Sequence, residues 1–332
     1  MKTLVITDLH LNNKIRGLLD AQCACLSRIF QEENPNEIII MGDVFMSRKP
    51  SPSVLLGLKK LLDSYPIPIH IIRGNHDSET KADDGITALS LFQNEYVEVY
   101  NHTHTQWSKE RVFIPHYENE QRIIEDLGKA PKDFIVFGHF GYNGSLNSAG
   151  DADFGMPLSV FLNTTYLGHI HQFSQRSVEH EGSVQTVTCL GTPYTTNFTE
   201  AGKGNYYAVI ENGDVTFKEV THGPRYVCIS RNTVSEDLND PNYFNIVRVY
   251  VDKLSDTEDY YIAKDIFSKY DVQYLEIKYK PVFDEEVETY YNPETNPFDL
   301  NRSVLEEYVN NTPVDLEKDK LLEGLDLINA NK

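Results

Sequence analysis

Positive charge is scarce in this sequence. Its 332 residues include 30 lysines and arginines against 50 aspartates and glutamates, so the formal net charge is -20 at pH 7. This excess of negative charge excludes a diffuse basic face for nucleic acid. A polyanionic partner would have to bind through bound cations, a local basic patch or a second subunit.

Cysteines and long apolar runs are also few. The four cysteines show no paired zinc-site spacing, and Cys23 and Cys25 fall in a helical pattern, where they are most simply packed thiols. This favours a reducing compartment. Only about five apolar residues precede Asp8, too few for a signal-peptide core, and no apolar run approaches membrane-spanning length. We therefore expect a cytoplasmic protein without membrane contact.

The sequence does contain a short apolar run that stops at two side chains able to bind a metal. Residues 3–7 form this run, and Asp8-Leu9-His10 follows. Side chains two positions apart in an extended chain point the same way, so Asp8 and His10 can address one point past the strand end. A carboxylate beside an imidazole suits Mn, Fe, Zn or Co. Alone, the triplet is most often an ordinary turn.

The same pattern recurs four times along the chain. Each further apolar segment is typical of a strand covered on both faces and leads to glycine and a potential ligand. The glycines let the backbone turn sharply and approach an ion. The segments end in Gly42-Asp43, Gly74-Asn75-His76-Asp77, Gly138-His139 and Gly168-His169-Ile170-His171.

The spacing between these segments predicts an α/β fold. An apolar stripe over residues 19–30 indicates an amphipathic helix, and Ser51 and Pro52 mark the start of a second. Beyond residue 97 the predicted strands are shorter and alternate with turns, which indicates a second sheet packed on the first. We expect a two-sheet β-sandwich flanked by helices, with ligands at the carboxyl ends of strands.

The sequence changes character near residue 222. Residues 1–222 form the domain that carries every potential ligand, and residues 223–283 show a strand, helix, strand pattern that predicts a small α+β domain. Residues 284–300 have the acidic, proline-containing composition of a linker. Residues 301–332 contain two short amphipathic helical patterns, so we expect a C-terminal helical tail.

As an ordered set, the strand-end motifs resemble the signature of the calcineurin-like metallophosphoesterases, over about residues 1–220. The resemblance implies two divalent metal ions bridged by Asp43. The first ion would be held by Asp8, His10 and His171, and the second by Asn75, His139 and His169. His76 would protonate the leaving oxygen or stabilise its charge, oriented by Asp77; the alternative for Asp77 is that it only caps the following turn.

Two further segments are similar to the double-strand-break-repair nucleases, the SbcD-like subunits and their phage recombination relatives. These segments are Gly42-Asp43-Val44-Phe45 with Ser47-Arg48-Lys49-Pro50-Ser51, and Gly191-Thr192-Pro193-Tyr194 with Phe198-Thr199-Glu200. The compact C-terminal half suggests the phage version, in the host cytoplasm. This resemblance implies Mn²⁺, DNA exonuclease or endonuclease activity in end processing and recombination, a homodimer, and 223–283 as a capping domain. Residues 301–332 would bind an SbcC-like coiled-coil ATPase.

One departure and several open alternatives accompany this resemblance. Met46 stands where the nucleases usually have histidine. A metallophosphatase or small-molecule phosphodiesterase could use the same site, although protein phosphatases continue Gly-Asp with Asp-Arg-Gly rather than this sequence. A non-catalytic scaffold would be expected to have lost ligands or His76. Surface charge is the default for Arg48, Lys49 and Arg73, and the remaining histidines, among them His70 and His116, are expected to be ordinary polar residues.

Overall fold

The computed structural model describes residues 1–146, 155–180, 182–230, 237–251 and 256–279. These residues lie in one compact unit, Met1–Lys280. The predicted linker 284–300 and tail 301–332 lie outside the described residues. No helix in the described part of the chain is long and apolar enough to cross a membrane.

The first sheet is built around the N-terminal strands, in the order β12-β11-β1-β2-β3-β4. Strands β1 to β4 are parallel, and β11 and β12 extend the sheet in antiparallel fashion. Helices α1 (Leu18–Glu33) and α2 (Pro52–Asp63) connect the first three strands. The strands are β1 (Lys2–Ile6), β2 (Glu37–Ile40), β3 (Ile69–Ile72), β4 (Val97–Tyr100), β11 (Tyr206–Glu211) and β12 (Asp214–Glu219).

The second sheet has the order β5-β6-β7-β8-β10-β9, with a parallel centre and two antiparallel edge strands. Helix α3 (Glu120–Lys129) joins β6 to β7, and short 3₁₀ helices occupy other connections. The strands are β5 (His104–Gln106), β6 (Arg111–Ile114), β7 (Ile135–His139), β8 (Thr165–Gly168), β9 (Ser174–His180) and β10 (Ser183–Cys189). The 3₁₀ helices are η1 (Ala88–Phe92), η2 (Trp107–Lys109), η3 (Leu158–Val160) and η4 (Phe198–Glu200).

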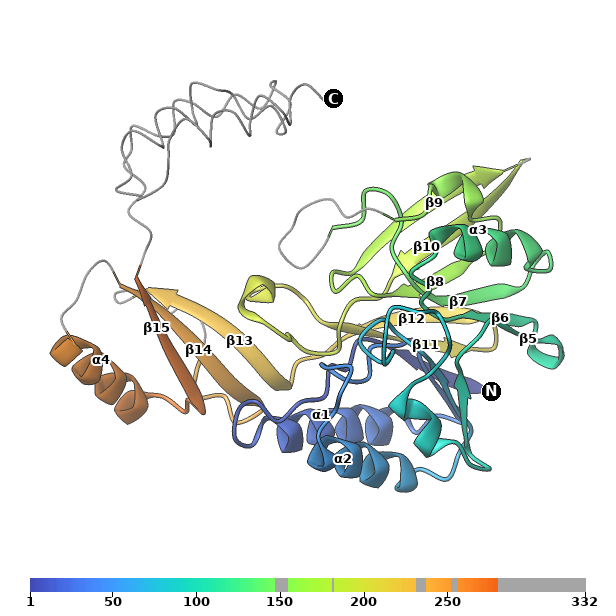
Figure 1. Cartoon of the computed structure of the whole chain (residues 1–332). Coiled ribbons are helices and arrows are strands. Elements are labelled where there is room, and N and C mark those ends of the chain that lie inside the picture. Colours follow the sequence, from blue (N-terminus) through green and yellow to red (C-terminus); the bar gives the residue numbers. More distant parts are fainter. Residues whose placement is uncertain (147–154, 181, 231–236, 252–255, 280–332) are drawn as a thin grey trace, which may run out of the picture. The chain divides into compact units, whose positions relative to one another are not determined.

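The two sheets pack face to face, with helices on their outer faces (Figure 1). Val5 and Ile39 of the first sheet share a buried cluster with Phe113 and Phe137 of the second. On the outer side of the first sheet, α1 and α2 bury their apolar stripes against the strands, and α3 does so on the second sheet. Burial of these stripes is the main stabilising contribution to such layers. The predicted two-sheet sandwich flanked by helices is therefore confirmed.

Glu37 joins the two sheets through a buried ion pair. Its Oε2 accepts from Arg111 Nη1 of β6 at 2.6 Å, and its Oε1 lies 3.0 Å from His70 Nε2. The carboxylate is fully buried, yet its several donors compensate for the loss of water. His70 thus has the ordinary hydrogen-bonded role that the sequence predicts.

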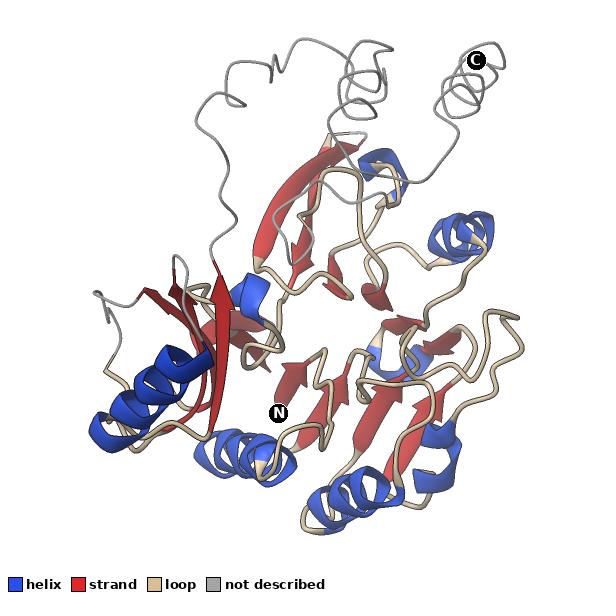
Figure 2. Ribbon diagram, turned by 60° about the vertical axis from the view of Figure 1, so that its left-hand side comes forward, coloured by secondary structure: helices blue, strands red, loops and turns tan. Residues whose placement is uncertain are grey.

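A third, three-stranded parallel sheet follows the sandwich, in the order β13-β14-β15 (Figure 2). It comprises β13 (Gly223–Ser230), β14 (Tyr243–Val251), α4 (Asp256–Lys269) and β15 (Tyr274–Tyr279). The predicted strand, helix, strand pattern is present, with β13 added. The boundaries of a separate capping domain at 223–283 stay a prediction.

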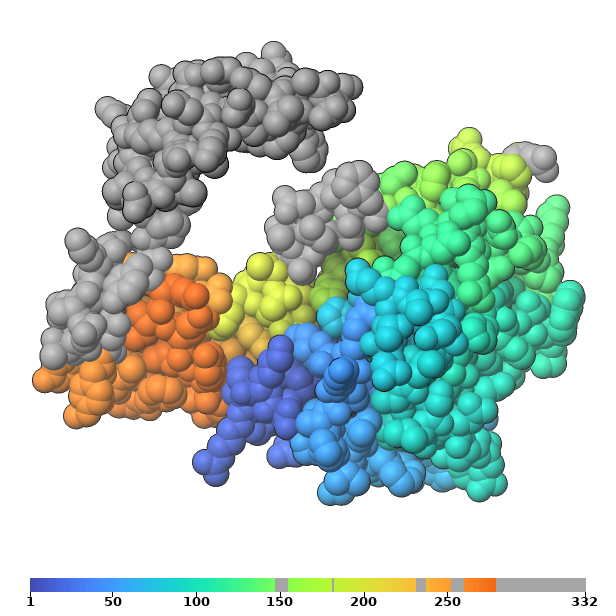
Figure 3. Space-filling view, viewed as in Figure 1, coloured from blue at the N-terminus to red at the C-terminus, as the bar shows by residue number. Residues whose placement is uncertain are grey.

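The third sheet packs on α1, and the space-filling view shows it, in orange, beside the dark-blue N-terminal residues (Figure 3). Arg28 Nη1 donates to Asn242 Oδ1 at 2.9 Å. Gly223 has φ +98°, and a Cβ atom there would lie 2.6 Å from Cys25 Sγ. A glycine is therefore required where the chain leaves the sandwich for β13.

Candidate metal centre

The predicted ligands lie at the carboxyl ends of strands β1, β2, β3, β7 and β8, where His139 is the last residue of β7 and the others follow on the loops. Four of them have positive φ although they are not glycine: Asp8 (53°), His10 (44°), Asp43 (47°) and His169 (78°). This backbone conformation is costly for L-residues and concentrates at functional sites, where surrounding contacts hold it. The loops therefore contain local backbone strain at the positions whose side chains converge on the candidate site.

The first group of converging side chains is Asp8, His10 and His171. His10 Nε2 and His171 Nε2 lie 3.0 Å apart, and Asp8 Oδ1 lies 3.8 Å from the former and 3.7 Å from the latter. His171 Nδ1 lies 2.6 Å from Glu200 Oε1 and donates to it. His171 Nε2 can therefore present a lone pair to the group, as a metal ligand must.

The second group is Asp43, His139 and His169, with Asn75 between the two imidazoles. Asn75 Oδ1 lies 3.1 Å from His139 Nε2 and 3.0 Å from His169 Nδ1, and Asp43 Oδ1 lies 3.3 Å from His139 Nε2. Asp43 Oδ2 is also 3.8 Å from His10 Nε2 of the first group. Asp43 thus touches both groups, which is the position that a bridging carboxylate needs.

Burial sets the electrostatics of this centre. It raises the pKa of the Asp8 carboxyl and lowers the pKa of His10 well below its usual value, because each charged form is desolvated. Burial also acts on Asp43 and His139, but their mutual attraction outweighs it. The pKa of Asp43 is held far below its usual range, and that of His139 rises to about 9.

The donor set fits two divalent ions. Imidazole nitrogens with carboxylate and amide oxygens suit Mn, Fe, Zn or Co. His139 Nδ1 donates to the Met41 carbonyl at 2.6 Å, so its Nε2 is left for an ion, as in His171. The structure brings all seven predicted ligands together in the two groups, and their individual roles toward each ion stay predictions.

His76 lies beside the two groups rather than within them. Its backbone N–H donates to Asp43 Oδ1 at 2.8 Å, and its ring meets the His10 ring edge-on with centroids 5.1 Å apart. His76 Nδ1 lies 3.0 Å from the Met46 carbonyl oxygen, to which it must donate. The backbone at position 46 therefore orients the imidazole, although the Met46 side chain differs from the nuclease pattern.

The structure gives the Asp77 carboxylate hydrogen-bond partners other than His76, and its orienting role toward His76 stays a prediction. The Asp77 carboxylate is buried and accepts from three backbone N–H groups, those of Gly74 at 2.9 Å, Phe45 at 3.0 Å and Val44 at 3.3 Å. It thus holds the loop after β3 against the loop after β2. Sequence proximity suggested an orienting role. Backbone N–H groups of the two loops need a buried acceptor, and the Asp77 carboxylate provides it.

His116 is a residue near the centre that sequence analysis placed among the ordinary histidines. Its ring centroid lies 5.9 Å from that of His169 and 6.3 Å from that of His139, and its buried Nδ1 has no hydrogen-bond partner among the described residues. Arg73 holds its backbone, because Arg73 Nη2 donates to the His116 carbonyl at 2.7 Å. The apolar strand β6 ends just before His116, which is the signal that could have identified it.

The cations that flank the motifs have different surroundings. Arg73 is 1% exposed, so it supports the loops and cannot serve as a surface phosphate ligand. Arg48 Nη2 pairs with Glu118 Oε1 at 3.3 Å, and Lys49 is exposed. Surface charge thus remains the simplest description of Arg48 and Lys49.

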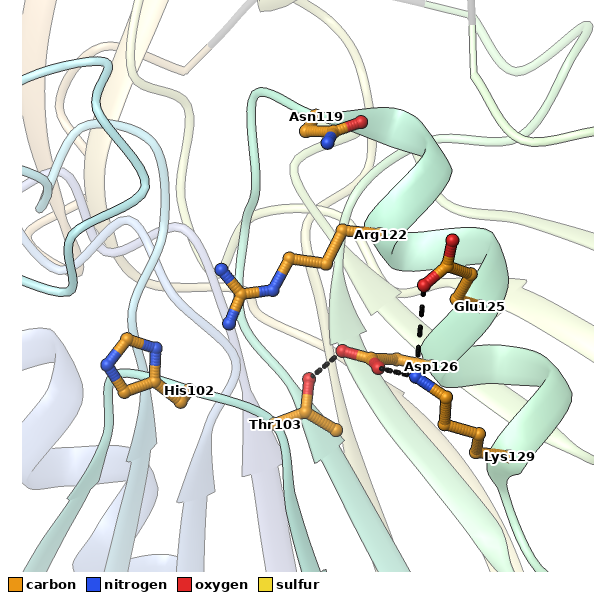
Figure 4. Close-up of a pocket in the computed structure, with 7 residues that line it drawn as sticks. All are labelled: His102, Thr103, Asn119, Arg122, Glu125, Asp126 and Lys129. Atoms are coloured by element: carbon orange, nitrogen blue, oxygen red, sulfur yellow. Dashed lines mark hydrogen bonds and ion pairs between the residues drawn. The ribbon is translucent and has the colours of Figure 1, made fainter.

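A cavity of about 520 Å³ lies beside α3 and contains none of the predicted ligands (Figure 4). Its polar groups largely satisfy one another: Asp126 accepts from Thr103 Oγ1 at 2.6 Å and pairs with Lys129 at 3.4 Å. Arg122 lies over the Tyr117 ring at 3.8 Å. Within the described part of the chain, the groups of converging metal ligands lie at the metal centre and not in this cavity, so the metal centre is the candidate active site.

Comparison with solved structures finds distant likenesses. A nuclease from Pseudomonas putida has 15% identity, covers 65% of this chain and 87% of its own, and gives a TM-score of 0.32. An archaeal phosphodiesterase has 12% identity, covers 66% and 99%, and gives 0.37. A dimetal phosphatase from Danio rerio has 12% identity, covers 66% and 95%, and gives 0.40. Because all three TM-scores are below 0.5, we draw no conclusion about this chain from these likenesses.

No curated protein matches the chain. The sequence model of the family described as calcineurin-like phosphoesterase matches residues 1–173, which is more than half of the 332 residues. The matched segment includes all seven predicted ligands, from Asp8 to His171. The chain belongs to the calcineurin-like phosphoesterases.

Proposed function

We propose that the chain is a metal-dependent DNA nuclease that hydrolyses phosphodiester bonds in DNA end processing and recombination. The observation that carries the proposal is the pair of ligand groups joined by Asp43, which lies 3.3 Å from His139 Nε2 and 3.8 Å from His10 Nε2. The two groups would hold two divalent ions, Mn²⁺ in this proposal, which would supply the Lewis acidity that activates a water and offsets negative charge on the reacting oxygens.

His76 is the residue outside the two groups that suits general acid catalysis. Its Nδ1 is fixed as a donor by the Met46 carbonyl, so protonation or deprotonation takes place at Nε2. In the cationic form, Nε2 can give its proton to the leaving oxygen of the phosphodiester.

Support for DNA over small phosphoesters comes from the segment after Asp43. Ser47-Arg48-Lys49-Pro50-Ser51 is similar to the SbcD-like nucleases, whereas protein phosphatases of the superfamily have Asp-Arg-Gly after Gly-Asp. A metallophosphatase or small-molecule phosphodiesterase is the second candidate, because the metal centre would serve either reaction. A non-catalytic scaffold is disfavoured, since all seven predicted ligands and His76 are present.

The direct test is cleavage of labelled linear duplex and single-stranded DNA with Mn²⁺, with Mg²⁺ or with EDTA. We expect hydrolysis with Mn²⁺ and none with EDTA. A phosphomonoester and a small phosphodiester serve as comparison substrates, and the Asp43→Ala variant controls for contaminating nucleases. If the DNA stays intact while the phosphomonoester is hydrolysed rapidly, the nuclease proposal is wrong and the chain is a metallophosphatase.

We further propose that residues 301–332, which lie outside the described residues, bind an SbcC-like coiled-coil ATPase, and that the nuclease acts as a homodimer. The support is the similarity of the motifs to the SbcD-like branch and the two amphipathic patterns in 301–332.

A further inference from the structure

Glu200 is a buried carboxylate that contacts the metal centre from outside. It is 3% exposed and lies at the end of η4, 29 positions after His171. Its Oε1 accepts from His171 Nδ1 at 2.6 Å. A charge this deeply buried persists only when several donors replace its water shell.

Those donors come from the turn that precedes η4. Thr196 N donates to Glu200 Oε2 at 2.6 Å, Thr196 Oγ1 lies 2.9 Å from Oε1, and Asn197 Nδ2 donates to Oε1 at 2.7 Å. Asn197 also accepts from Thr199 N at 2.8 Å, which fixes the start of η4. The carboxylate therefore cannot move toward or away from His171 without breaking the turn.

The turn is itself packed on the third sheet. The Phe198 ring meets the Tyr226 ring edge-on at 4.9 Å, and the Arg248 guanidinium lies 3.9 Å above Phe198. Tyr226 N donates to Thr195 Oγ1 at 2.7 Å. Strands β13 and β14 thus form the wall against which the Glu200 turn is held.

We propose that Glu200 is a positioning residue, which orients His171 and sets the affinity of the first ligand group for its ion. This inference rests on the metal-dependent function proposed above. By accepting from Nδ1, Glu200 selects the tautomer whose Nε2 lone pair faces Asp8 and His10. A carboxylate partner also makes the imidazole a more basic ligand than a neutral acceptor does.

The two ligand groups differ in this respect. His139 of the second group donates its Nδ1 to the backbone carbonyl of Met41, at the same distance of 2.6 Å. A neutral carbonyl gives orientation without charge, whereas Glu200 gives both. Loss of the Glu200 charge should therefore weaken one ion and spare the other.

The test is a titration of the metal-free, full-length chain with Mn²⁺ by calorimetry, for wild type, Glu200→Gln and Glu200→Ala. Glu33→Gln is the matched control, because Glu33 is a 4% exposed carboxylate whose partners, Lys2, Tyr207 and Lys218, include no predicted ligand. We expect wild type to bind two ions. Glu200→Ala should weaken one of them roughly 10- to 100-fold, and Glu200→Gln should weaken the same ion less.

Spectroscopy gives a second measurement that does not depend on activity. With Co²⁺ in place of Mn²⁺, the visible absorption of the ion in the first ligand group should change in both Glu200 variants. It should stay unchanged in Glu33→Gln. Unaltered affinity for both ions in Glu200→Ala, or an equal loss at both, would overturn the positioning role. If the Glu200 variants behave as expected but wild type leaves DNA intact, only the nuclease proposal fails.

Discussion

His76 adjoins the candidate metal centre but belongs to neither of its two ligand groups. It contacts Asp43 through its backbone N–H and donates its ring Nδ1 to Met46. We expect His76→Ala to keep both ions and to lose about 10²- to 10⁴-fold in turnover, the range typical of general acid catalysis. Metal content of the purified variant, measured beside its DNA cleavage rate, checks this.

Asp43 provides the comparison, because it lies against histidines of both ligand groups. Asp43→Ala should lose metal together with activity. Loss of ions from His76→Ala as well would mean that His76 belongs among the ligands.

We expect Asp77 to contribute to the stability of the folded chain. Its three backbone donors would be left buried without an acceptor in Asp77→Ala. We expect this change to cost about 3 kcal/mol of unfolding free energy, since each unsatisfied buried group costs about 1–3 kcal/mol. Asp77→Asn keeps one acceptor oxygen and should cost less. Urea denaturation of the metal-free proteins measures both. A fully stable Asp77→Ala with reduced turnover would instead restore the orienting role toward His76.

Among the elements, the end of α1 is tied to three strands through one carboxylate. Glu33 accepts from Tyr207 of β11 and from Lys218 of β12, both at 2.7 Å, and pairs with Lys2 of β1 at 2.6 Å. Burial would raise the pKa of Glu33, but these donors outweigh it and lower the pKa from 4.5 to about 2. The folded chain therefore binds this proton less readily than the unfolded chain does.

This difference predicts a pH dependence. A lowered folded-state pKa contributes stability that is complete above pH 4.5 and is lost as the pH falls toward 2. Glu33→Gln should destabilise the chain at pH 6, and the difference from wild type should shrink to roughly half or less at pH 3. Urea denaturation in EDTA at the two pH values measures it. An equal difference at both would show that the ion pairs contribute nothing through this carboxylate.

At the scale of the whole molecule, the net charge of -20 opposes binding to DNA. Few local lysines and arginines can displace counterions, so the metal-free monomer should bind duplex DNA weakly at physiological salt. We expect binding to strengthen with Mn²⁺, on dimerisation or with the ATPase. Fluorescence anisotropy with His76→Ala, which should leave the DNA intact, separates these conditions. Nanomolar affinity of the metal-free monomer would contradict the expectation.

Deletion of residues 300–332 tests the proposed partner. We expect the truncated chain to fold over residues 1–280 and to bind two ions, but to lose complex formation with the SbcC-like ATPase. Co-purification with that ATPase, compared with the full chain, gives the answer. Undiminished affinity after the deletion would place the ATPase contact elsewhere.

Local patterns were enough to predict much of the molecule. Continuous apolar runs such as residues 37–40 indicate strands buried on both faces, and helical stripes such as residues 19–30 indicate the connections. Parallel strands joined by helices place their carboxyl ends at one edge, so the motifs after Ile6, Ile40 and Ile72 could be expected to meet. These inferences succeed because strand and helix periodicities are properties of neighbouring residues.

Only the tertiary structure decided the contacts between residues that are distant in sequence. Asp77 binds amides at positions 44 and 45, Arg73 supports the backbone at 116, and Glu200 reaches His171 from 29 positions away. A side chain's partners depend on which loops the packed sheets bring together and on which buried polar groups still need one. The sequence by itself therefore determined the kinds of ligand and the edge where they gather, while the packing of the sheets decided which residues hold them in place.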